Sequence, residues 1–178
     1  QMIKYKIRRG KISHIFISHL HGDHYFGLVG LLHSFGLLGH QQELHVFGPR
    51  GLREIIEIQL NAADTALPYA LHFHILNEKE TAVDNDKFFV RCFKTNHRVE
   101  CYGFVFGEKK RLRRIEIEKV RAYGIPGSFY ERLKDGEDYI TKEGTVIKNE
   151  LVTSAGPKAK SYAYCADTKY DESIIPHI

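Results

Sequence analysis

The sequence feature that most constrains the fold is a short strand-like run followed directly by a group of histidines. Residues 12–18 are β-rich and lead into Ser18-His19-Leu20-His21-Gly22-Asp23-His24. We predict that His19 and His21 share a face at the end of a strand, because alternate side chains of an extended segment point the same way. Gly22 permits a sharp turn into the next helix, so three imidazoles and one carboxylate are predicted on one loop.

This set of side chains has the chemistry of a metal site. Imidazole nitrogen and carboxylate oxygen are both ligands that zinc accepts. A mononuclear site needs only three such groups, so four donors on one loop favour two adjacent metals. Two metals about 3.5–4 Å apart can clamp the attacking and leaving oxygens of a phosphodiester.

Two further candidate ligands follow predicted strands. His97 comes after a strand predicted over residues 88–93, and Asp167 comes after one predicted over 161–165. Sites of layered α/β folds are built where strands end. Taken alone, His97 is equally well a structural histidine, and Asp167 is the weaker candidate of the two, because an Asp before Thr is also a common turn or capping residue.

The order of predicted elements favours an α/β layered sandwich. We predict strands over 12–18, 43–47, 71–76, 88–93, 102–106 and 161–165, and a helix over 22–35. A second helix is predicted to start at Pro49, an allowed first-turn position, and to end near residue 61. Residues 109–134 are basic with few core-type runs, so we predict an excursion from the domain there.

Composition is that of an ordinary globular protein. The chain has 178 residues, of which 43% are hydrophobic and 27% charged, and its net charge is +4. No membrane span or signal peptide is visible, so we expect a cytoplasmic protein. The mild positive charge is compatible with a polyanionic substrate. Widely spaced cysteines predict three buried thiols, at Cys92, Cys101 and Cys165.

The histidine run and its surroundings resemble a known family. HxHxDH is the signature of the metallo-β-lactamase superfamily, and residues 15–28 are similar to the ribonuclease Z form of it. Residues 47–52, Phe-Gly-Pro-Arg-Gly-Leu, resemble that family's next strand-to-helix turn. The spacings of 73 residues from His24 to His97 and 70 from His97 to Asp167 fit as well. Residues 124–126 and 133–136 resemble the base of the family's substrate-binding arm.

The resemblance implies a fold, a reaction and roles. Residues 1–178 would form one metallo-β-lactamase-type αββα four-layer sandwich, incomplete, with 108–137 as an inserted arm. The reaction would be zinc-dependent endonucleolytic removal of the 3′ trailer from precursor tRNA, leaving a 3′-hydroxyl. One zinc would be held by three histidines and the second by Asp23 and His24, with Asp167 between them and Asp23 also acting as general base. The three histidines of the first zinc would be His19, His21 and His97.

The chain also departs from the family pattern. Residues 127–129, Gly-Ser-Phe, replace the family's Pro-Gly-Pro, and Ala166 replaces a glycine. The resemblance places two strands before Gln1 and a last zinc-binding histidine after Ile178. We therefore expect a fragment, with two Zn²⁺ per complete chain but one ligand missing here from the second site. Such a fragment is expected to bind metal weakly and to be inactive or nearly so.

Precursor tRNA and a second copy of the chain are the expected partners. Five basic side chains are candidates for phosphate contacts, with a solvated loop as the alternative. They are Lys109, Lys110, Arg111, Arg113 and Arg114. Homodimerisation is implied by the family alone.

Two other functions remain open. One is a superfamily hydrolase of small esters, thioesters or phosphodiesters, against which the arm-like segment argues. The other is a binding module without catalysis. Histidines outside the signature are expected to have packing or surface roles, among them His33, His40, His45, His72 and His74.

Overall fold

The chain forms two compact units. The computed structural model describes residues 2, 4–78, 80–109 and 112–178. The first unit, here called the body, comprises Gln1–Asp84, Phe89–Phe106 and Tyr162–Ile178. The second, here called the insert, comprises Asn85–Phe88 and Gly107–Ser161. Residues 108–137, predicted as an arm, fall within the insert.

The first sheet of the body is parallel. It contains β1 (His14–Phe16), β2 (Leu44–Gly48) and β3 (Leu71–Ile75) in that order, preceded by a 3₁₀ turn, η1 (Arg9–Lys11). Parallel neighbours require crossover connections, and helices supply them here. The strands end at the same edge of the sheet, which is where the histidine run begins.

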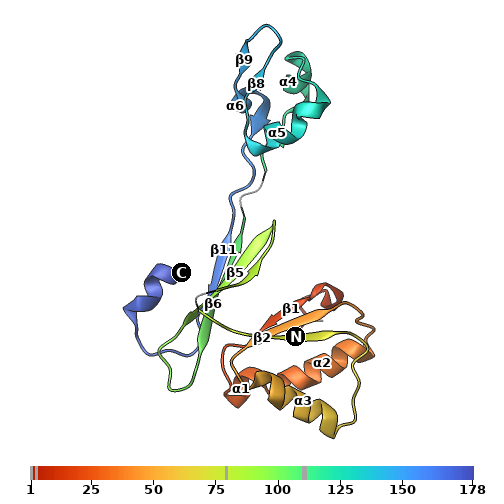
Figure 1. Cartoon of the computed structure of the whole chain (residues 1–178), viewed down its shortest axis with the longest axis vertical. Coiled ribbons are helices and arrows are strands. Elements are labelled where there is room, and N and C mark those ends of the chain that lie inside the picture. Colours follow the sequence, from red (N-terminus) through yellow and green to blue (C-terminus); the bar gives the residue numbers. More distant parts are fainter. Residues whose placement is uncertain (1, 3, 79, 110–111) are drawn as a thin grey trace. The chain divides into compact units, whose positions relative to one another are not determined.

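Helices cover one face of this sheet (Figure 1). They are α1 (Gly22–Tyr25), α2 (Gly27–Leu37) and α3 (Leu52–Ala62). Both longer helices bury residues at helical spacing, which gives each an apolar stripe toward the sheet. The buried residues are Leu28, Leu32 and Phe35 in α2 and Leu52, Ile56 and Leu60 in α3.

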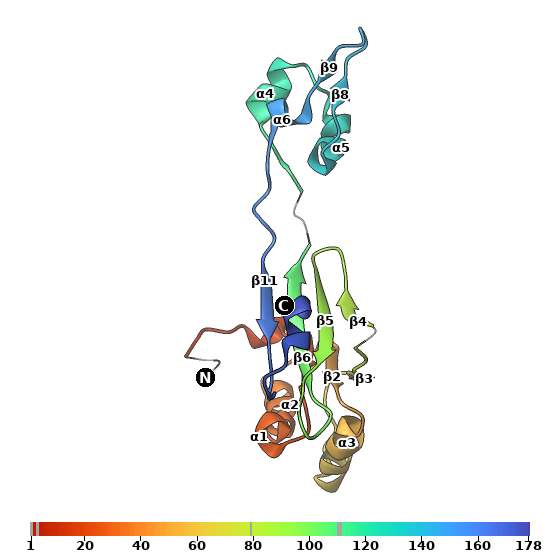
Figure 2. The same ribbon diagram turned by 90° about the vertical axis from the view of Figure 1, so that its left-hand side faces the viewer.

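A second sheet packs on the other face of the first. Its order is β11 (Ser161–Tyr164), β6 (Tyr102–Glu108), β5 (Phe88–Lys94) and β4 (Thr81–Asp84), as Figure 2 shows. Phe47 of the first sheet packs with Val90, Tyr102 and Phe104 of the second in one buried cluster. The α/β prediction is confirmed, and the described residues supply three layers: helices, sheet and sheet.

The C-terminal segment lies against the outer face of the second sheet. A 3₁₀ helix, η3 (Glu172–His177), places the ring of His177 on Phe93 with centroids 5.4 Å apart. None of the helices among the described residues is long and apolar enough to cross a membrane.

Two predicted helix boundaries were wrong. The helix predicted over 22–35 is divided at Phe26 into α1 and α2 and continues to Leu37. The helix predicted to start at Pro49 begins at Leu52, because Gly51 before it adopts φ +96°. That left-handed conformation suits glycine and lies outside the helix.

The insert has a core of its own, contrary to the expectation of few core-type runs. Five residues from different short elements form it: Val120, Ile125, Leu133, Ile147 and Val152. The elements are β7 (Arg114–Ile115), α4 (Ile117–Ala122), η2 (Gly127–Phe129), α5 (Tyr130–Asp135), β8 (Tyr139–Ile140), β9 (Val146–Ile147), α6 (Asn149–Val152) and β10 (Thr153–Ser154). Pieces of two to six residues are too short for hydrophobic periodicity to reveal.

The cysteine prediction holds for two thiols of three. Cys92 and Cys101 are buried, whereas Cys165 is exposed. Cys165 follows β11, an edge strand whose four residues are all exposed, so a thiol there reaches solvent.

Candidate metal centre

The loop that follows β1 carries the first histidines and is held on both sides. The Ile17 N–H donates to the Phe47 carbonyl at 2.8 Å, and the Tyr102 N–H donates to the Ser18 carbonyl at 3.0 Å. The next residue, His19, is fully buried at 0% exposure. Backbone pairing with both sheets therefore fixes the position of this imidazole.

The short helix α1 brings His24 back beside His19. His21 is the residue before the helix, and the His24 N–H donates to its carbonyl at 3.0 Å. The rings of His19 and His24 have centroids 4.0 Å apart. A Cβ added at Gly22 would meet the ring of Phe26, an exposed side chain that would have to move aside.

Four predicted ligands converge. His19, His21, His97 and Asp167 each present a donor atom, and all four atoms lie within 4.8 Å of one another. His21 Nδ1 is 3.0 Å from His19 Nε2 and 3.3 Å from His97 Nε2. Tetrahedral zinc with Zn–N bonds of about 2.0–2.1 Å places its ligand nitrogens about 3.3 Å apart. These spacings therefore fit a metal held among the three rings.

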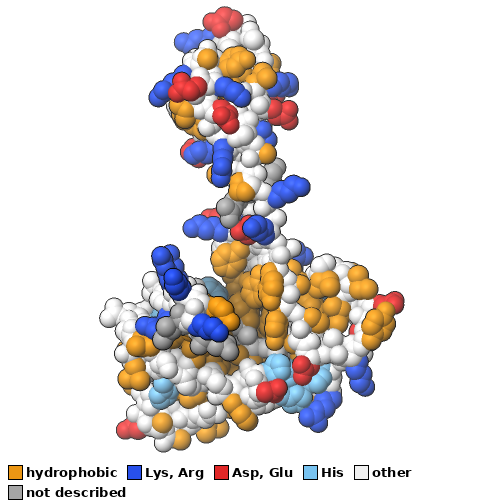
Figure 3. Space-filling model, turned by 180° about the vertical axis from the view of Figure 1, so that it is seen from behind, with side chains coloured by type: hydrophobic (Ala, Val, Ile, Leu, Met, Phe, Trp, Pro, Cys, Tyr) orange, Lys and Arg blue, Asp and Glu red, His pale blue; other side chains and the backbone are white. Residues whose placement is uncertain are grey.

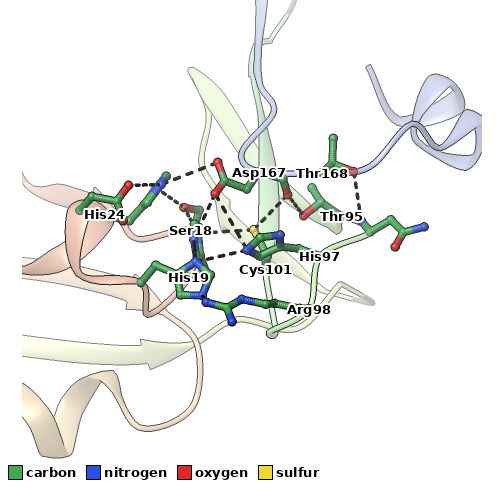
Figure 4. Close-up of polar contacts among 12 residues, drawn as sticks. Ser18, His19, His24, Thr95, His97, Arg98, Cys101, Asp167 and Thr168 are labelled. Carbon is green, nitrogen blue, oxygen red and sulfur yellow. Dashed lines mark hydrogen bonds and ion pairs between the residues drawn. The ribbon is translucent and has the colours of Figure 1, made fainter.

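Asp167 faces two groups of ligands at once (Figure 4). Its Oδ2 is 3.7 Å from His19 Nε2 and 3.9 Å from His97 Nε2. Its Oδ1 is 3.8 Å from His24 Nε2. On the other side of His24, Asp23 Oδ2 is 3.6 Å from the same nitrogen, with a side chain that is 81% exposed. The arrangement offers a second, more open set of donors beside the first.

The protonation state of His19 suits a metal ligand. Burial lowers its pKa, and the neighbouring His24 and His21 lower it further. Neutral imidazole, with a free nitrogen lone pair, is the form that binds metals. Histidine nitrogens with a carboxylate are a donor set that fits zinc.

Side chains behind the ligands hold them in place. Ser18 Oγ lies 3.1 Å from His19 Nδ1 and 3.3 Å from His24 Nδ1. Cys101 Sγ lies 3.5 Å from His19 Nδ1. These nitrogens face away from the donor cluster, so the contacts orient both rings.

The segment that carries Asp167 is tied to the segment that carries His97. Thr95 Oγ1 donates to the Asp167 carbonyl at 2.8 Å, and the Lys169 N–H donates to the Asn96 carbonyl at 2.8 Å. Two candidate ligands from distant parts of the sequence, His97 and Asp167, are thereby held side by side. Figure 3 shows histidine and acidic side chains gathered on one surface of the body.

Several contact residues were missed from sequence. Ser18 was predicted only as the end of a strand and Cys101 only as a buried thiol, and Thr95 was not singled out. Arg98 was not singled out, yet its Nη2 lies 3.2 Å from His21 Nε2. Its position directly after His97 was the one available signal.

The predicted RNA-contact residues belong to the insert. Arg114 is exposed, whereas Arg113 is half-buried and donates from Nε to Thr153 Oγ1 at 2.7 Å. Lys109 donates its backbone N–H to the Lys87 carbonyl at 2.8 Å. Lys110 and Arg111 lie outside the described residues.

A second group of histidines lies on the first sheet. His14, His45, His72 and His74 lie on β1, β2 and β3, where strand pairing aligns His14 with His45 and His45 with His72. The rings of neighbouring strands stack, as do those of His74 and Phe47 at 4.4 Å. We call this group the histidine ladder.

The sequence is similar to several ribonucleases Z. A ribonuclease Z of Bacteroides fragilis is 39% identical over 180 residues, covering 100% of this chain and 59% of the relative. A ribonuclease Z of Porphyromonas gingivalis is 37% identical over 175 residues, covering 97% of this chain and 58% of the relative. The chain thus spans about three fifths of the length of these relatives.

A solved structure and a family pattern agree with them. The crystal structure of the short form of human tRNase Z is 31% identical and superposes with a TM-score of 0.53. That superposition covers 61% of this chain and 48% of the human one. Residues 3–115 match the beta-lactamase superfamily domain, which is more than half of the chain. Its histidine signature, layered fold and relatives place this chain in the beta-lactamase superfamily.

Proposed function

We propose that the protein is a zinc-dependent endoribonuclease that removes the 3′ trailer from precursor tRNA and leaves a 3′-hydroxyl. The observation that carries the proposal is the convergence of three imidazoles and one carboxylate within 4.8 Å. The ribonuclease Z relatives, at up to 39% identity across the whole chain, support RNA as the substrate.

Two zinc ions per complete chain are part of the proposal. His19, His21 and His97 would hold one, Asp23 and His24 would hold the other, and Asp167 would lie between them. The two oxygens of Asp167 support this division, because each faces a different set of histidines. A bound zinc pair would supply Lewis-acid stabilisation of charge at the phosphate and activation of the attacking water.

Asp23 is proposed as the general base. Its carboxylate is 81% exposed and therefore open to water and substrate, while its Oδ2 stays 3.6 Å from His24 Nε2. From there it would orient the attacking water toward phosphorus and accept its proton. A positioned general base contributes about 10²–10⁴-fold to the rate.

The insert is proposed to bind the RNA backbone. It contains fourteen lysines and arginines against ten aspartates and glutamates, whereas the body contains twelve of each. All of the net charge of +4 therefore lies in the insert. Lys109, Lys110, Arg111, Arg113 and Arg114 are the proposed contacts, with Arg113 also bound to Thr153. Phosphate contacts of this kind weaken as salt rises.

A cytoplasmic homodimer is the proposed state of the complete protein. The proposal rests on the family resemblance and on the relatives' similarity. Light scattering after size-exclusion chromatography would test the dimer, and a monomer at all concentrations would contradict it.

The function is tested by cleavage of a precursor tRNA labelled in its trailer, with zinc supplied. We would assay the 178-residue chain and a hybrid in which it replaces the matching part of the Bacteroides fragilis relative. The hybrid is expected to release the trailer and leave a 3′-hydroxyl, and its Asp23→Asn variant to be slower by about 100-fold or more.

Other outcomes would assign other functions. Hydrolysis of a small chromogenic ester or phosphodiester by a hybrid that leaves precursor tRNA intact would contradict the RNA substrate and favour a small-molecule hydrolase. A hybrid that binds no zinc would favour a binding module without catalysis.

A further inference from the structure

We propose that Ser18 is a positioning residue whose single hydroxyl fixes the orientation of His19 and His24 together, one histidine from each half of the centre. This inference rests on the metal centre of the proposed function. Its hydroxyl contacts the Nδ1 atoms of the two rings and not the nitrogens that face Asp167, and the serine is only 4% exposed, which keeps it out of reach of RNA.

The hydroxyl is held between the two rings. Ser18 Oγ is 3.1 Å from His19 Nδ1 and 3.3 Å from His24 Nδ1 (Figure 4). The backbone position of Ser18 is fixed, because its carbonyl accepts a hydrogen bond from the Tyr102 N–H at 3.0 Å. The backbone of Ser18 is therefore bound to the second sheet, while its hydroxyl contacts His19 in the loop after β1 and His24 in α1.

The chemistry allows one assignment of protons at these rings. In both histidines Nε2 faces Asp167, at 3.7 Å for His19 and 3.8 Å for His24. A neutral imidazole carries its proton on only one nitrogen, and a metal ligand nitrogen carries none. Each Nδ1 must therefore be the N–H, and a hydroxyl oxygen with two lone pairs can accept from both. Partners of this kind fix the tautomer and orientation of a ligand histidine.

The two histidines do not depend on Ser18 equally. His19 Nδ1 also lies 3.5 Å from Cys101 Sγ, which can accept weakly in place of the serine. Within the part of the chain that the structure describes, His24 Nδ1 has only Ser18 Oγ within hydrogen-bonding distance. Removing the hydroxyl should therefore disturb His24 first and His19 second.

The first measurement is made on the unaltered chain. Imidazole ¹⁵N shifts of the zinc-loaded 178-residue protein at pH 8 report which nitrogen of each ring is protonated. We expect Nδ1–H at both His19 and His24. A proton on Nε2 of His24 would overturn the proposal without any variant.

The variants then separate the two rings. Ser18→Ala is expected to weaken zinc binding by about 10–100-fold and to give a mixture of tautomers at His24, with His19 little changed. Adding Cys101→Ala should extend the mixture to His19. Ser18→Thr, which keeps a hydroxyl, should restore zinc affinity and the His24 tautomer.

Ser13→Ala is a matched control, because Ser13 Oγ makes the same kind of contact with the neighbouring His14 Nδ1 at 2.8 Å, and His14 belongs to the histidine ladder and not to the metal centre. It should leave zinc affinity unchanged. Unchanged zinc affinity and an unchanged His24 tautomer in Ser18→Ala would overturn the proposal.

The outcome is separable from that of the proposed function. If the hybrid cleaves no RNA while the tautomers and zinc affinities behave as expected, the nuclease proposal fails and the role of Ser18 stands. If RNA is cleaved while Ser18→Ala binds zinc as tightly as the unaltered chain, only the role of Ser18 fails.

Discussion

The body contains two groups of histidines whose rings are arranged differently. In the histidine ladder, His14 and His45 are 21° from parallel and His45 and His72 are 20° from parallel. In the metal centre, the rings of His19 and His21 meet at 79°. Ring centroids are a similar 4.6–5.2 Å apart in these three pairs, so orientation and not proximity separates the groups.

The difference comes from the backbone beneath each group. Neighbouring strands hold aligned residues side by side about 4.8 Å apart, so the rings of aligned histidines stack. Loops at strand ends are not held in the register of the sheet, so histidine rings on such loops can point toward a common centre. Among the described residues, only the metal centre brings three or more donor atoms within 4.8 Å. Each group contains four histidines, so a count of histidines would not have distinguished the metal centre from the ladder.

The largest test of this comparison removes one histidine from each group. His19→Ala should weaken zinc binding by more than about 100-fold, because even the loss of a partner behind a ligand costs about 10–100-fold. His45→Ala should leave it unchanged. Competition with a chromophoric chelator measures both, and equal losses in the two variants would contradict the assignment of the site.

A smaller effect is expected from neutralising one carboxylate in each group. Asp167→Asn keeps the shape and the Thr95 contact to its backbone but removes the charge, and should cost about tenfold or more in zinc affinity. Glu43→Gln is the matched control, because Glu43 Oε2 lies 3.6 Å from His72 Nε2 in the ladder. Competition with the chromophoric chelator measures both zinc affinities. Equal affinities in Asp167→Asn and Glu43→Gln would count against a direct role for Asp167.

The smallest expected effect concerns the ladder and pH. Burial, and then the neighbouring His45, lower the pKa of His14 and His74 below the ordinary 6.5. Below about pH 6.5 the unfolded chain therefore binds more protons than the folded one, and stability falls as pH drops through that value.

His74→Phe should keep the stacking on Phe47 and remove one titrating group. Between pH 7.5 and 5.5 in the presence of a chelator, its melting temperature should fall by about 1–4 °C less than that of the unaltered chain. Identical falls in the two proteins would show that His74 does not contribute.

The centre was predicted more fully than its surroundings. His19, His21 and His24 were singled out because a two-residue spacing at a strand end followed by a glycine turn leaves few geometries. His97 and Asp167 came from strand ends and from the family spacing, and the structure brings both to the same cluster. Ser18 was missed because a hydroxyl at a strand end has no sequence signal of its own.

The core of the insert could not be predicted from the sequence. Its core draws Val120 from α4, Leu133 from α5 and Val152 from α6, helices of six, six and four residues. No window of that length carries a readable period. The exposed Cys165 was missed for another reason: burial depends on whether a strand lies at the edge of its sheet, which only the pairing order reveals.

The separate core of the insert bears on how quickly the centre can form. β6 and β11 are neighbours in one sheet, yet the chain between them is a loop of about fifty residues, and closing a loop of that length costs entropy. Within the insert, the Glu108 N–H donates to the Lys160 carbonyl at 2.8 Å. Once the insert has folded, Glu108 and Lys160 are adjacent. The pairing of β6 with β11 then requires no more loop closure than a short hairpin does. Asp167 lies three residues after the end of β11, so this candidate ligand would reach the cluster by local pairing of β11 with β6 and not by a long-range search.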